Sequence, residues 1–210
     1  MTTFYDYWRS SAAYRLRIAL GLINLPHTVV SVNLLAGEQR SPENLARNPQ
    51  GLVPTLEIDG LILTQSLAIL EYLDETRNAG FLPKDAPGRA RTRALAYAIA
   101  MEIAPVCNLS VRSHVASASG GAITAEGWQA HFMARGLEAF EKMLDHPATG
   151  RFCHGDRISI ADICLVPQVY NARRLGLDVT SLSQISRIMG NLDSIPAVQA
   201  AHPDQHRPKG

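Results

Sequence analysis

The chain changes from strand to helix within Trp8-Arg9-Ser10-Ser11-Ala12-Ala13-Tyr14-Arg15-Leu16-Arg17-Ile18-Ala19-Leu20. The segment before it, residues 4–7, alternates apolar and polar side chains, and the segment after the two serines has helical periodicity. Free main-chain N–H groups and the positive end of the helix dipole gather at such a point, so Ser10 and Ser11 are well placed to hold an anion or a thiolate. The first 106 residues contain no cysteine. Any thiol handled there must therefore arrive on a ligand.

The composition is that of an ordinary soluble protein. Of its 210 residues, 46% are hydrophobic and 19% are charged, and the formal net charge is +1. Charges form no long block, which argues against nucleic acid or an anionic membrane as a partner. The three cysteines, Cys107, Cys153 and Cys164, lack the spacing of a disulfide framework or a metal site, so neither is expected. We expect no signal peptide and no apolar stretch long enough to span a bilayer, and predict a cytoplasmic protein.

Hydrophobic periodicity predicts two domains. The first, residues 1–83, has the order strand (2–7), helix (11–24), strand (28–32), short helix from Pro42, hairpin (55–63) around Asp59-Gly60, and helix (66–77). The second, residues 89–210, is predicted to be all-α, with helices over 89–119, 124–145, 160–175, 182–192 and 196–201 and a frayed tail over 202–210. Ser159 and Asp162 predict a capping arrangement. The predicted fold is a thioredoxin-like α/β domain followed by an all-α domain, with a linker near 82–88.

The first helix of this predicted fold begins without the dithiol motif. Redox members need Cys-x-x-Cys at this place, whereas this chain has Ser10-Ser11-Ala12-Ala13, which excludes dithiol exchange. A serine hydroxyl can instead donate a hydrogen bond to a bound thiolate, and the helix dipole adds to its stabilisation. The alternative is that a serine simply caps the helix; with two serines, one can cap while the other faces a ligand.

Two further loops carry polar or main-chain groups suited to a peptide. Val53-Pro54 stands at the entrance of a strand and is a candidate cis peptide, which would present the Val53 main chain to an extended peptide; the alternative is a trans proline that begins an edge strand. Gln65-Ser66 begins a helix, where an N–H, a hydroxyl and an amide can bind a carboxylate, unless Ser66 is only a cap. A thiol site, a pairing site and a carboxylate site together suit glutathione.

The same residues resemble those of the glutathione transferases, and within them the zeta class, the maleylacetoacetate isomerases. The matching blocks in the first domain are Arg9-Ser10-Ser11 with Arg15 to Leu20, Asn48-Pro49 with Val53 to Leu56, and Gln65 to Ile69 with Glu71 to Leu73. Those in the second domain are Asn108 to Val111 and Ala161 to Val169, followed by Asn171-Ala172 and Arg174. The resemblance covers nearly the whole chain.

The resemblance implies roles for residues of both domains. It places Ser10 and Ser11 at the glutathione sulfur as catalytic residues. It places Arg9 and Arg174 at the carboxylates of a small dianionic substrate, where a guanidinium offers a bidentate fork. Residues implied to bind the cofactor glutathione are Val53, Gln65, Ser66, Gln50, Gln39 and Asn108, with Glu102 reaching it across the interface of a homodimer.

The implied reaction is glutathione-dependent cis–trans isomerisation of maleylacetoacetate to fumarylacetoacetate in tyrosine and phenylalanine catabolism. Glutathione thiolate adds to the double bond, the bond rotates, and the thiolate leaves. One departure is Ala12, because the family pattern is Ser-Ser-Cys. Two alternatives stay within enzymes, an isomerase of maleylpyruvate and a general glutathione transferase. A third is a glutathione-binding module without catalysis.

Overall fold

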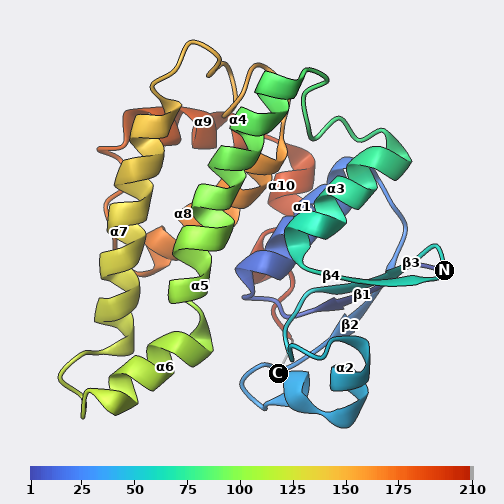
Figure 1. Cartoon of the computed structure of the whole chain (residues 1–210), viewed down its shortest axis with the longest axis vertical. Coiled ribbons are helices and arrows are strands. Elements are labelled where there is room, and N and C mark those ends of the chain that lie inside the picture. Colours follow the sequence, from blue (N-terminus) through green and yellow to red (C-terminus); the bar gives the residue numbers. More distant parts are fainter. Residues whose placement is uncertain (209–210) are drawn as a thin grey trace. The chain divides into compact units, whose positions relative to one another are not determined.

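The computed structural model describes residues 1–208, and its elements are labelled in Figure 1. Contacts within the chain define two compact units. One is Met1–Phe81 together with the C-terminal residues from Ser194, and the other is Leu82–Asp193. The first unit contains a four-stranded sheet with helices and the second is built from helices. This confirms the predicted fold class, a thioredoxin-like α/β domain followed by an all-α domain.

The N-terminal unit is a mixed sheet with helices on its faces. Its elements are β1 (Thr3–Asp6), α1 (Ser11–Leu22), β2 (Thr28–Ser31), η1 (Glu38–Arg40), α2 (Pro42–Arg47), β3 (Thr55–Ile58), β4 (Leu61–Thr64) and α3 (Ser66–Arg77). The strand order is β2-β1-β3-β4, with β1 parallel to β2 and antiparallel to β3, and β3 antiparallel to β4. In Figure 1, α1 and α3 run together along one face of the sheet, and α2 lies at the other.

Apolar side chains of the two central strands and of α1 and α3 form the core of this unit. The largest fully buried ones are Phe4, Leu16, Ile18, Leu20, Leu56, Ile58, Ile69, Leu70 and Leu73. The hairpin predicted at Asp59-Gly60 is confirmed, since both residues have positive φ, 54° and 78°, as a two-residue turn of this kind requires. The central position of β1 and β3 brings the loops that follow β1 and precede β3 to neighbouring places.

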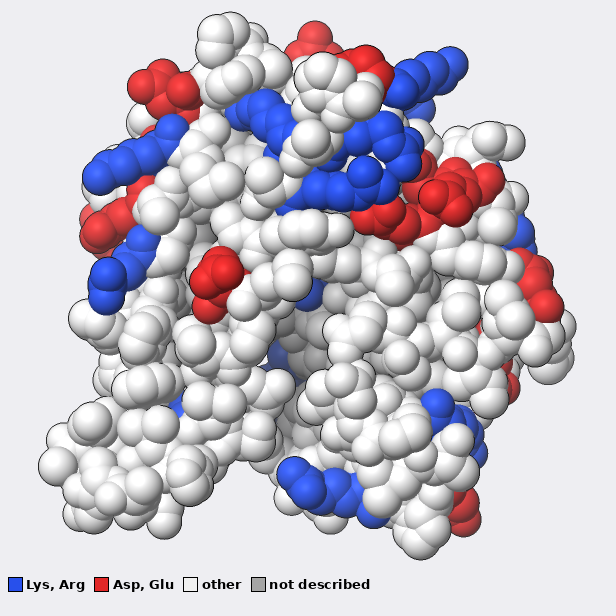
Figure 2. All heavy atoms as spheres, viewed as in Figure 1, with Lys and Arg blue, Asp and Glu red and all other residues white. Residues whose placement is uncertain are grey.

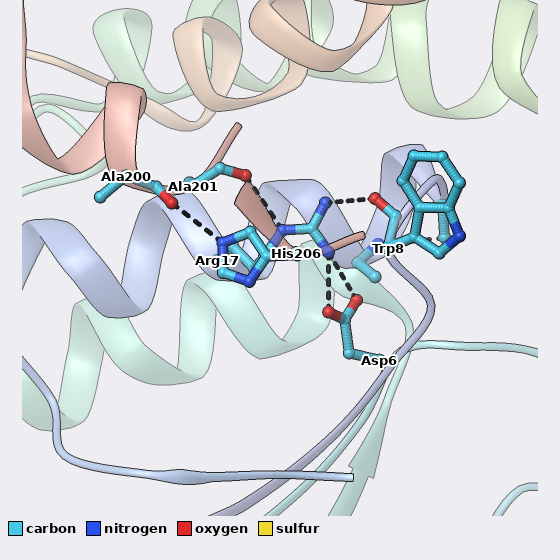
Figure 3. A network of polar contacts seen from close by, with 8 residues as sticks. Asp6, Trp8, Arg17, Ala200, Ala201 and His206 are labelled. Carbon is cyan, nitrogen blue, oxygen red and sulfur yellow. Dashed lines mark hydrogen bonds and ion pairs between the residues drawn. The ribbon is translucent and has the colours of Figure 1, made fainter. Parts of the chain in front are cut away.

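A C-terminal segment returns to the N-terminal unit and is held there by Arg17 (Figure 3). It contains α10 (Pro196–Ala200), which packs on α1, and η3 (Pro203–Gln205). The Arg17 guanidinium donates from Nη1 to both carboxylate oxygens of Asp6 at 2.7 and 2.8 Å, and from Nε to the Ala201 carbonyl at 3.0 Å. A ring nitrogen of His206 lies 2.9 Å from the Ala200 carbonyl.

This segment differs from the sequence-based expectation in two ways. The tail predicted to fray from 202 is ordered into η3 and bonded at His206; residues 209–210 lie outside the described residues. The predicted second domain ran over 89–210, whereas the contacts place the residues from Ser194 with the N-terminal unit. The physical reason is the buried Arg17 side chain, whose bond to Ala201 spans 184 positions and leaves no local pattern.

The helical unit is organised around α8 (Ile160–Arg174), most of whose residues are buried. Its elements are α4 (Ala86–Tyr97), η2 (Ala98–Ile103), α5 (Ala104–Val106), α6 (Leu109–Ala118), α7 (Ala125–Leu144), α8 (Ile160–Arg174) and α9 (Ser183–Leu192). The predicted capping arrangement at the start of α8 is confirmed as a capping box between Ser159 and Asp162. The single helix predicted over 89–119 is wrong, because a π-helical segment, Pro105 and the cap at Asn108 divide it.

The helical run from Ala86 to Ala118 also corrects the expectation that no apolar stretch could span a bilayer. By length and composition alone, this run of 33 residues is sufficient to cross a membrane. Only 22% of its most apolar window is buried within the chain. Tyr97 and Met101 are among its exposed large side chains, at 36% and 59% exposure. The run therefore presents apolar surface that the rest of the chain does not cover.

We expect Asp6→Asn to destabilise the protein strongly. The variant leaves the Arg17 guanidinium buried without its counter-charge, which typically costs about 3 kcal/mol or more. The matched control is Asp59→Asn, which removes the surface partner of Arg77. Its stability should change little, because exposed ion pairs contribute little. The free energy of unfolding in urea measures both, and equal effects of the two variants would contradict the role given to Arg17.

Candidate active site

The loop between β1 and α1 places both serines at the start of a helix. The Ser10 main-chain N–H donates to the Tyr7 carbonyl at 2.8 Å and closes a turn after the strand. Ser10 is the N-cap of α1, and its hydroxyl oxygen accepts a hydrogen bond from the Ala13 N–H at 3.2 Å. Ser11 is the first residue of the helix and is half-buried. No acidic residue occupies the first turn, so nothing in this turn repels an anion.

The capping role of Ser10 is compatible with a contact to a ligand. A hydroxyl carries two lone pairs and one proton, and the bond from Ala13 uses only a lone pair. The proton remains available to a thiolate, while the bond from Ala13 restrains the side chain. The sequence-based alternative of a helix cap is thus correct for Ser10, but capping and donation to a ligand do not exclude one another.

An apolar cluster joins this loop to the loop that precedes β3. Tyr5, Tyr7, Val32 and Val53 are buried together, and Trp8 packs against them. The Arg9 guanidinium lies over the Trp8 ring, 5.1 Å from its centroid. The predicted pairing residue Val53 is therefore anchored beside the strand end from which Arg9, Ser10 and Ser11 follow.

The Val53-Pro54 peptide bond is cis, so the alternative of a trans proline at an edge strand is wrong; β3 lies inside the sheet. The preceding loop is held by Asn48, which is 2% exposed. Its side chain donates to the Leu52 carbonyl at 2.9 Å and accepts from the Gln50 N–H at 3.1 Å. Within the described residues, the N–H and C=O of Val53 take part in no hydrogen bond, so they can pair with an extended ligand.

Gln50 and Gln65 meet in front of α3. The Gln65 amide donates to Oε1 of Gln50 at 2.7 Å. Gln65 is the N-cap residue and has the unusual dihedral angles φ 66° and ψ 109°. Residues other than glycine rarely adopt a positive φ. Where they do, they are often found at ligand-binding sites. The side chain of Gln65 makes no capping bond to α3, and the exposed amides of both residues are available to a ligand.

Ser66, the first residue of α3, is 5% exposed and is contacted by a residue to which the sequence assigned no role. Nη1 of Arg15 donates to its hydroxyl oxygen at 3.1 Å. Arg15 belongs to α1, so this bond connects the helix that begins with the serine pair to the helix that begins with Ser66. The sequence signals for Arg15 are its charge within an apolar helical stretch and its place in a block that resembles the family.

Gln39 lies in η1, on the same unit as the residues above. Its main-chain carbonyl accepts a bond from Asn44 at 2.8 Å. Its side-chain Oε1 is buried and has no hydrogen-bond partner among the described residues. Gln39 remains a predicted ligand contact.

Three of the predicted site residues belong to the helical unit. Glu102 is exposed in η2, and Arg174 is exposed as the last residue of α8. Asn108 is the N-cap of α6 and accepts a bond from the Ser110 N–H at 3.3 Å, which gives it a structural role in this helix. Their contacts with glutathione or substrate remain predictions.

The chain's own thiols are poorly suited to supply a thiolate. Burial raises the pKa of Cys107 to about 11, and burial together with Asp162 raises the pKa of Cys153 well above its usual range. All three cysteines are free, and Cys153 and Cys164 are buried. Ala12 occupies the position at which the family pattern Ser-Ser-Cys has its cysteine. At neutral pH a reactive thiolate at the start of α1 must therefore come from a bound molecule.

On the N-terminal unit the structure thus provides a helix start with two hydroxyls, a free main-chain edge at Val53, and a second helix start at Ser66. Hydroxyl and N–H donors at the two helix starts suit a thiolate and a carboxylate. The main-chain edge suits a peptide bond. This is the arrangement that an extended thiol-containing peptide requires.

Comparison with known proteins gives a consistent picture. Residues 1–75 match the family described as Glutathione S-transferase, N-terminal domain, and residues 126–193 match Glutathione S-transferase, C-terminal domain. A protein of Rhizobium meliloti (strain 1021) named maleylacetoacetate isomerase is 56% identical, covering 99% of this chain and 98% of its own length.

Two solved structures are similar over almost the whole fold. A bacterial maleyl pyruvate isomerase, described as a zeta-class glutathione S-transferase in its holo form, has a TM-score of 0.92 at 35% identity and covers 99% of each chain. The maleylacetoacetate isomerase of Methylobacterium extorquens AM1, with bound malonate and glutathione, has a TM-score of 0.92 at 39% identity and covers 98% of each chain. The chain therefore belongs to the glutathione S-transferases, in the zeta-class group that includes the maleylacetoacetate isomerases.

Proposed function

We propose that this protein is an enzyme that isomerises maleylacetoacetate to fumarylacetoacetate with glutathione as cofactor, in tyrosine and phenylalanine catabolism. The observation that carries the proposal is the set of three ligand-binding features on one unit, at Ser10-Ser11, Val53 and Gln65-Ser66. The similarity over the full length to a protein named for this activity supports it. The relative from Methylobacterium extorquens was solved with a dicarboxylate and glutathione bound.

The residues present fit glutathione. The buried Arg15 guanidinium, which donates to the Ser66 hydroxyl oxygen and has no carboxylate partner among the described residues, favours an anion beside Ser66. We assign this place to the γ-glutamyl carboxylate, with Gln65 contributing its amide. Val53 would pair with the cysteinyl unit through its main chain. Gln50, Gln39, Asn108 and, from a second copy, Glu102 are proposed as further polar contacts.

The proposed isomerisation depends on hydroxyl and guanidinium groups of this chain. When bound, glutathione supplies a thiolate that adds reversibly to the cis double bond and allows it to rotate. The hydroxyls of Ser10 and Ser11 and the N-terminus of α1 stabilise the negative charge on sulfur. Arg9 and Arg174 hold the substrate carboxylates and favour the charge that develops during addition. The protein's contributions are thus ionisation, orientation and charge stabilisation.

Two other substrates or reactions compete with this proposal. A similar structure is that of a maleyl pyruvate isomerase, so the cis-diacid could be maleylpyruvate. A general transferase would instead release a stable thioether. A binding module without catalysis is the alternative from another class, and Ala12 is the one departure that favours it; Arg9, Ser10, Ser11 and Arg174 are all retained.

We also propose that the protein is a cytoplasmic homodimer. Free cysteines suit a reducing compartment. Only 22% of the most apolar window of the run Ala86–Ala118 is buried within the chain, and Figure 2 shows few charged side chains over α5 and α6. A second copy would bury this surface, as exposed apolar patches in soluble proteins commonly mark interfaces. The same packing would bring Glu102 toward the partner.

The proposed activity predicts that purified protein converts maleylacetoacetate to fumarylacetoacetate only when glutathione is present, and without consuming it. Parallel assays with maleylpyruvate and with chloroaromatic electrophiles distinguish the alternatives. Accumulation of a thioether without isomerisation would contradict the proposal, and binding of glutathione without any turnover would favour the binding module.

The serine pair predicts separate losses of turnover. Of the variants Ser10→Ala and Ser11→Ala, the one that removes the hydrogen bond to sulfur should lower kcat/KM by about tenfold or more. The reason is that a hydrogen bond to a charged group contributes about 1.5–3 kcal/mol. Ser10→Ala also removes a helix cap, so Thr124→Ala is the control. Thr124 caps α7 by the same kind of bond, at 3.0 Å, and its loss should leave turnover unchanged. Full activity in both serine variants would refute the assignment.

The homodimer predicts a sedimentation mass of twice 22.9 kDa. Met101→Glu, which introduces a charge on the exposed apolar run, should shift the protein toward the monomer. Far-ultraviolet circular dichroism checks that the variant keeps its fold. A wild-type mass of a single chain at all concentrations tested would contradict the dimer.

A further inference from the structure

A buried positive charge lies against the first residue of α3. Arg15 is 3% exposed, and its only bond through the guanidinium is from Nη1 to the Ser66 hydroxyl oxygen, at 3.1 Å, within the described residues. Its Nε and Nη2 have no hydrogen-bond partner there. Arg17, two positions on, has the carboxylate of Asp6, whereas Arg15 has no ion pair among residues 1–208. Arginine remains charged in proteins, so the fold holds an uncompensated cation.

An uncompensated buried charge is unfavourable unless something of opposite sign binds nearby. The N-terminus of α3 has the same character. Its first intrahelical bond runs from the Ile69 N–H to the Gln65 carbonyl, so the earlier N–H groups lack an acceptor within the helix. The helix has no acidic residue in its first turn and no side-chain cap. A carboxylate at Ser66 would therefore stabilise both the buried Arg15 charge and the free N–H groups at the start of α3.

We propose that Arg15 is the positioning residue that makes Ser66 a donor to the γ-glutamyl carboxylate of glutathione. By donating to the Ser66 oxygen, Arg15 occupies a lone pair and leaves the hydroxyl proton for the ligand. Its charge adds to the field of the helix end. Because Nε and Nη2 are buried, Arg15 acts through Ser66 and does not touch the ligand. The inference rests on the proposed function, since it takes glutathione as the ligand.

The test compares two ligands in direct binding measurements. Glutathione is paired with 4-aminobutyryl-cysteinyl-glycine, which keeps the amine and thiol but lacks the γ-glutamyl α-carboxylate. Wild-type protein should bind glutathione at least about tenfold more tightly, as expected for hydrogen bonds to a charged group. In Arg15→Met, affinity for glutathione should fall about tenfold while affinity for the analogue stays the same. The ratio of the two dissociation constants then approaches one.

Two further variants keep this test decisive. Arg15→Lys preserves the charge and should retain part of the ratio, and it provides the answer if Arg15→Met does not fold by circular dichroism. Arg47→Met removes a different arginine of the same unit, which is half-buried and lies over the Tyr5 ring; the ratio of its two dissociation constants should match wild type.

The outcomes separate this inference from the function on which it rests. Equal weakening of both ligands in the Arg15 variants would mean a purely structural role and overturn the inference. A wild-type protein that binds both ligands equally would also overturn it, because no carboxylate site would exist at Ser66. If wild-type protein binds neither ligand, the proposed function itself fails.

Discussion

The hydrogen-bond fork of Arg17 is the constraint on which the N-terminal unit depends. Besides its bonds to Asp6 and Ala201, it donates from Nη2 to the Trp8 carbonyl at 2.8 Å (Figure 3). One buried side chain thus fixes the end of β1, the loop that leads to Ser10, and the returning C-terminal segment. Since a buried pair loses far more when broken than it gains when formed, its contribution is to specify this arrangement. The start of α1, where we propose that a thiol binds, therefore depends on Arg17 for its position.

In our proposal, the two helix starts on this unit bind two different groups of one ligand by similar physics. At α1, the Ser10 hydroxyl caps the helix, and in our proposal its proton is donated to the sulfur of the ligand. At α3, the side-chain cap is missing, and a buried guanidinium stands behind Ser66. α1 with its N-cap Ser10 carries the serine pair, and Arg15 on the same helix bonds to Ser66 at the start of α3. One helix therefore connects the two proposed contact points of the ligand. The Val53 main chain is held beside the strand end that leads to α1, because Val53 is buried together with Tyr5 and Tyr7.

Local patterns predicted the N-terminal unit well, because its signals are short. Asp59-Gly60 dictates a turn, and the periodicity over 66–77 gives α3 to the residue. The loops that carry the candidate site residues begin or end at equally short signals, so the sequence could point to them as candidates. The Arg15–Ser66 and Arg17–Ala201 bonds could not be predicted, because they join residues 51 and 184 positions apart and produce no local sequence pattern. The π-helical segment over 98–103 could not be predicted from the sequence either, because its residues are also found in ordinary α-helices.

The central claim is that the start of α1 stabilises a thiolate that the chain itself cannot provide. It is tested most directly by titrating the thiol of glutathione bound to the wild-type protein, following thiolate absorbance against pH. The account predicts a pKa at least one unit below that of free glutathione, whose thiol resembles a free cysteine with a pKa of about 8.5. A bound thiol that titrates like the free one would contradict it.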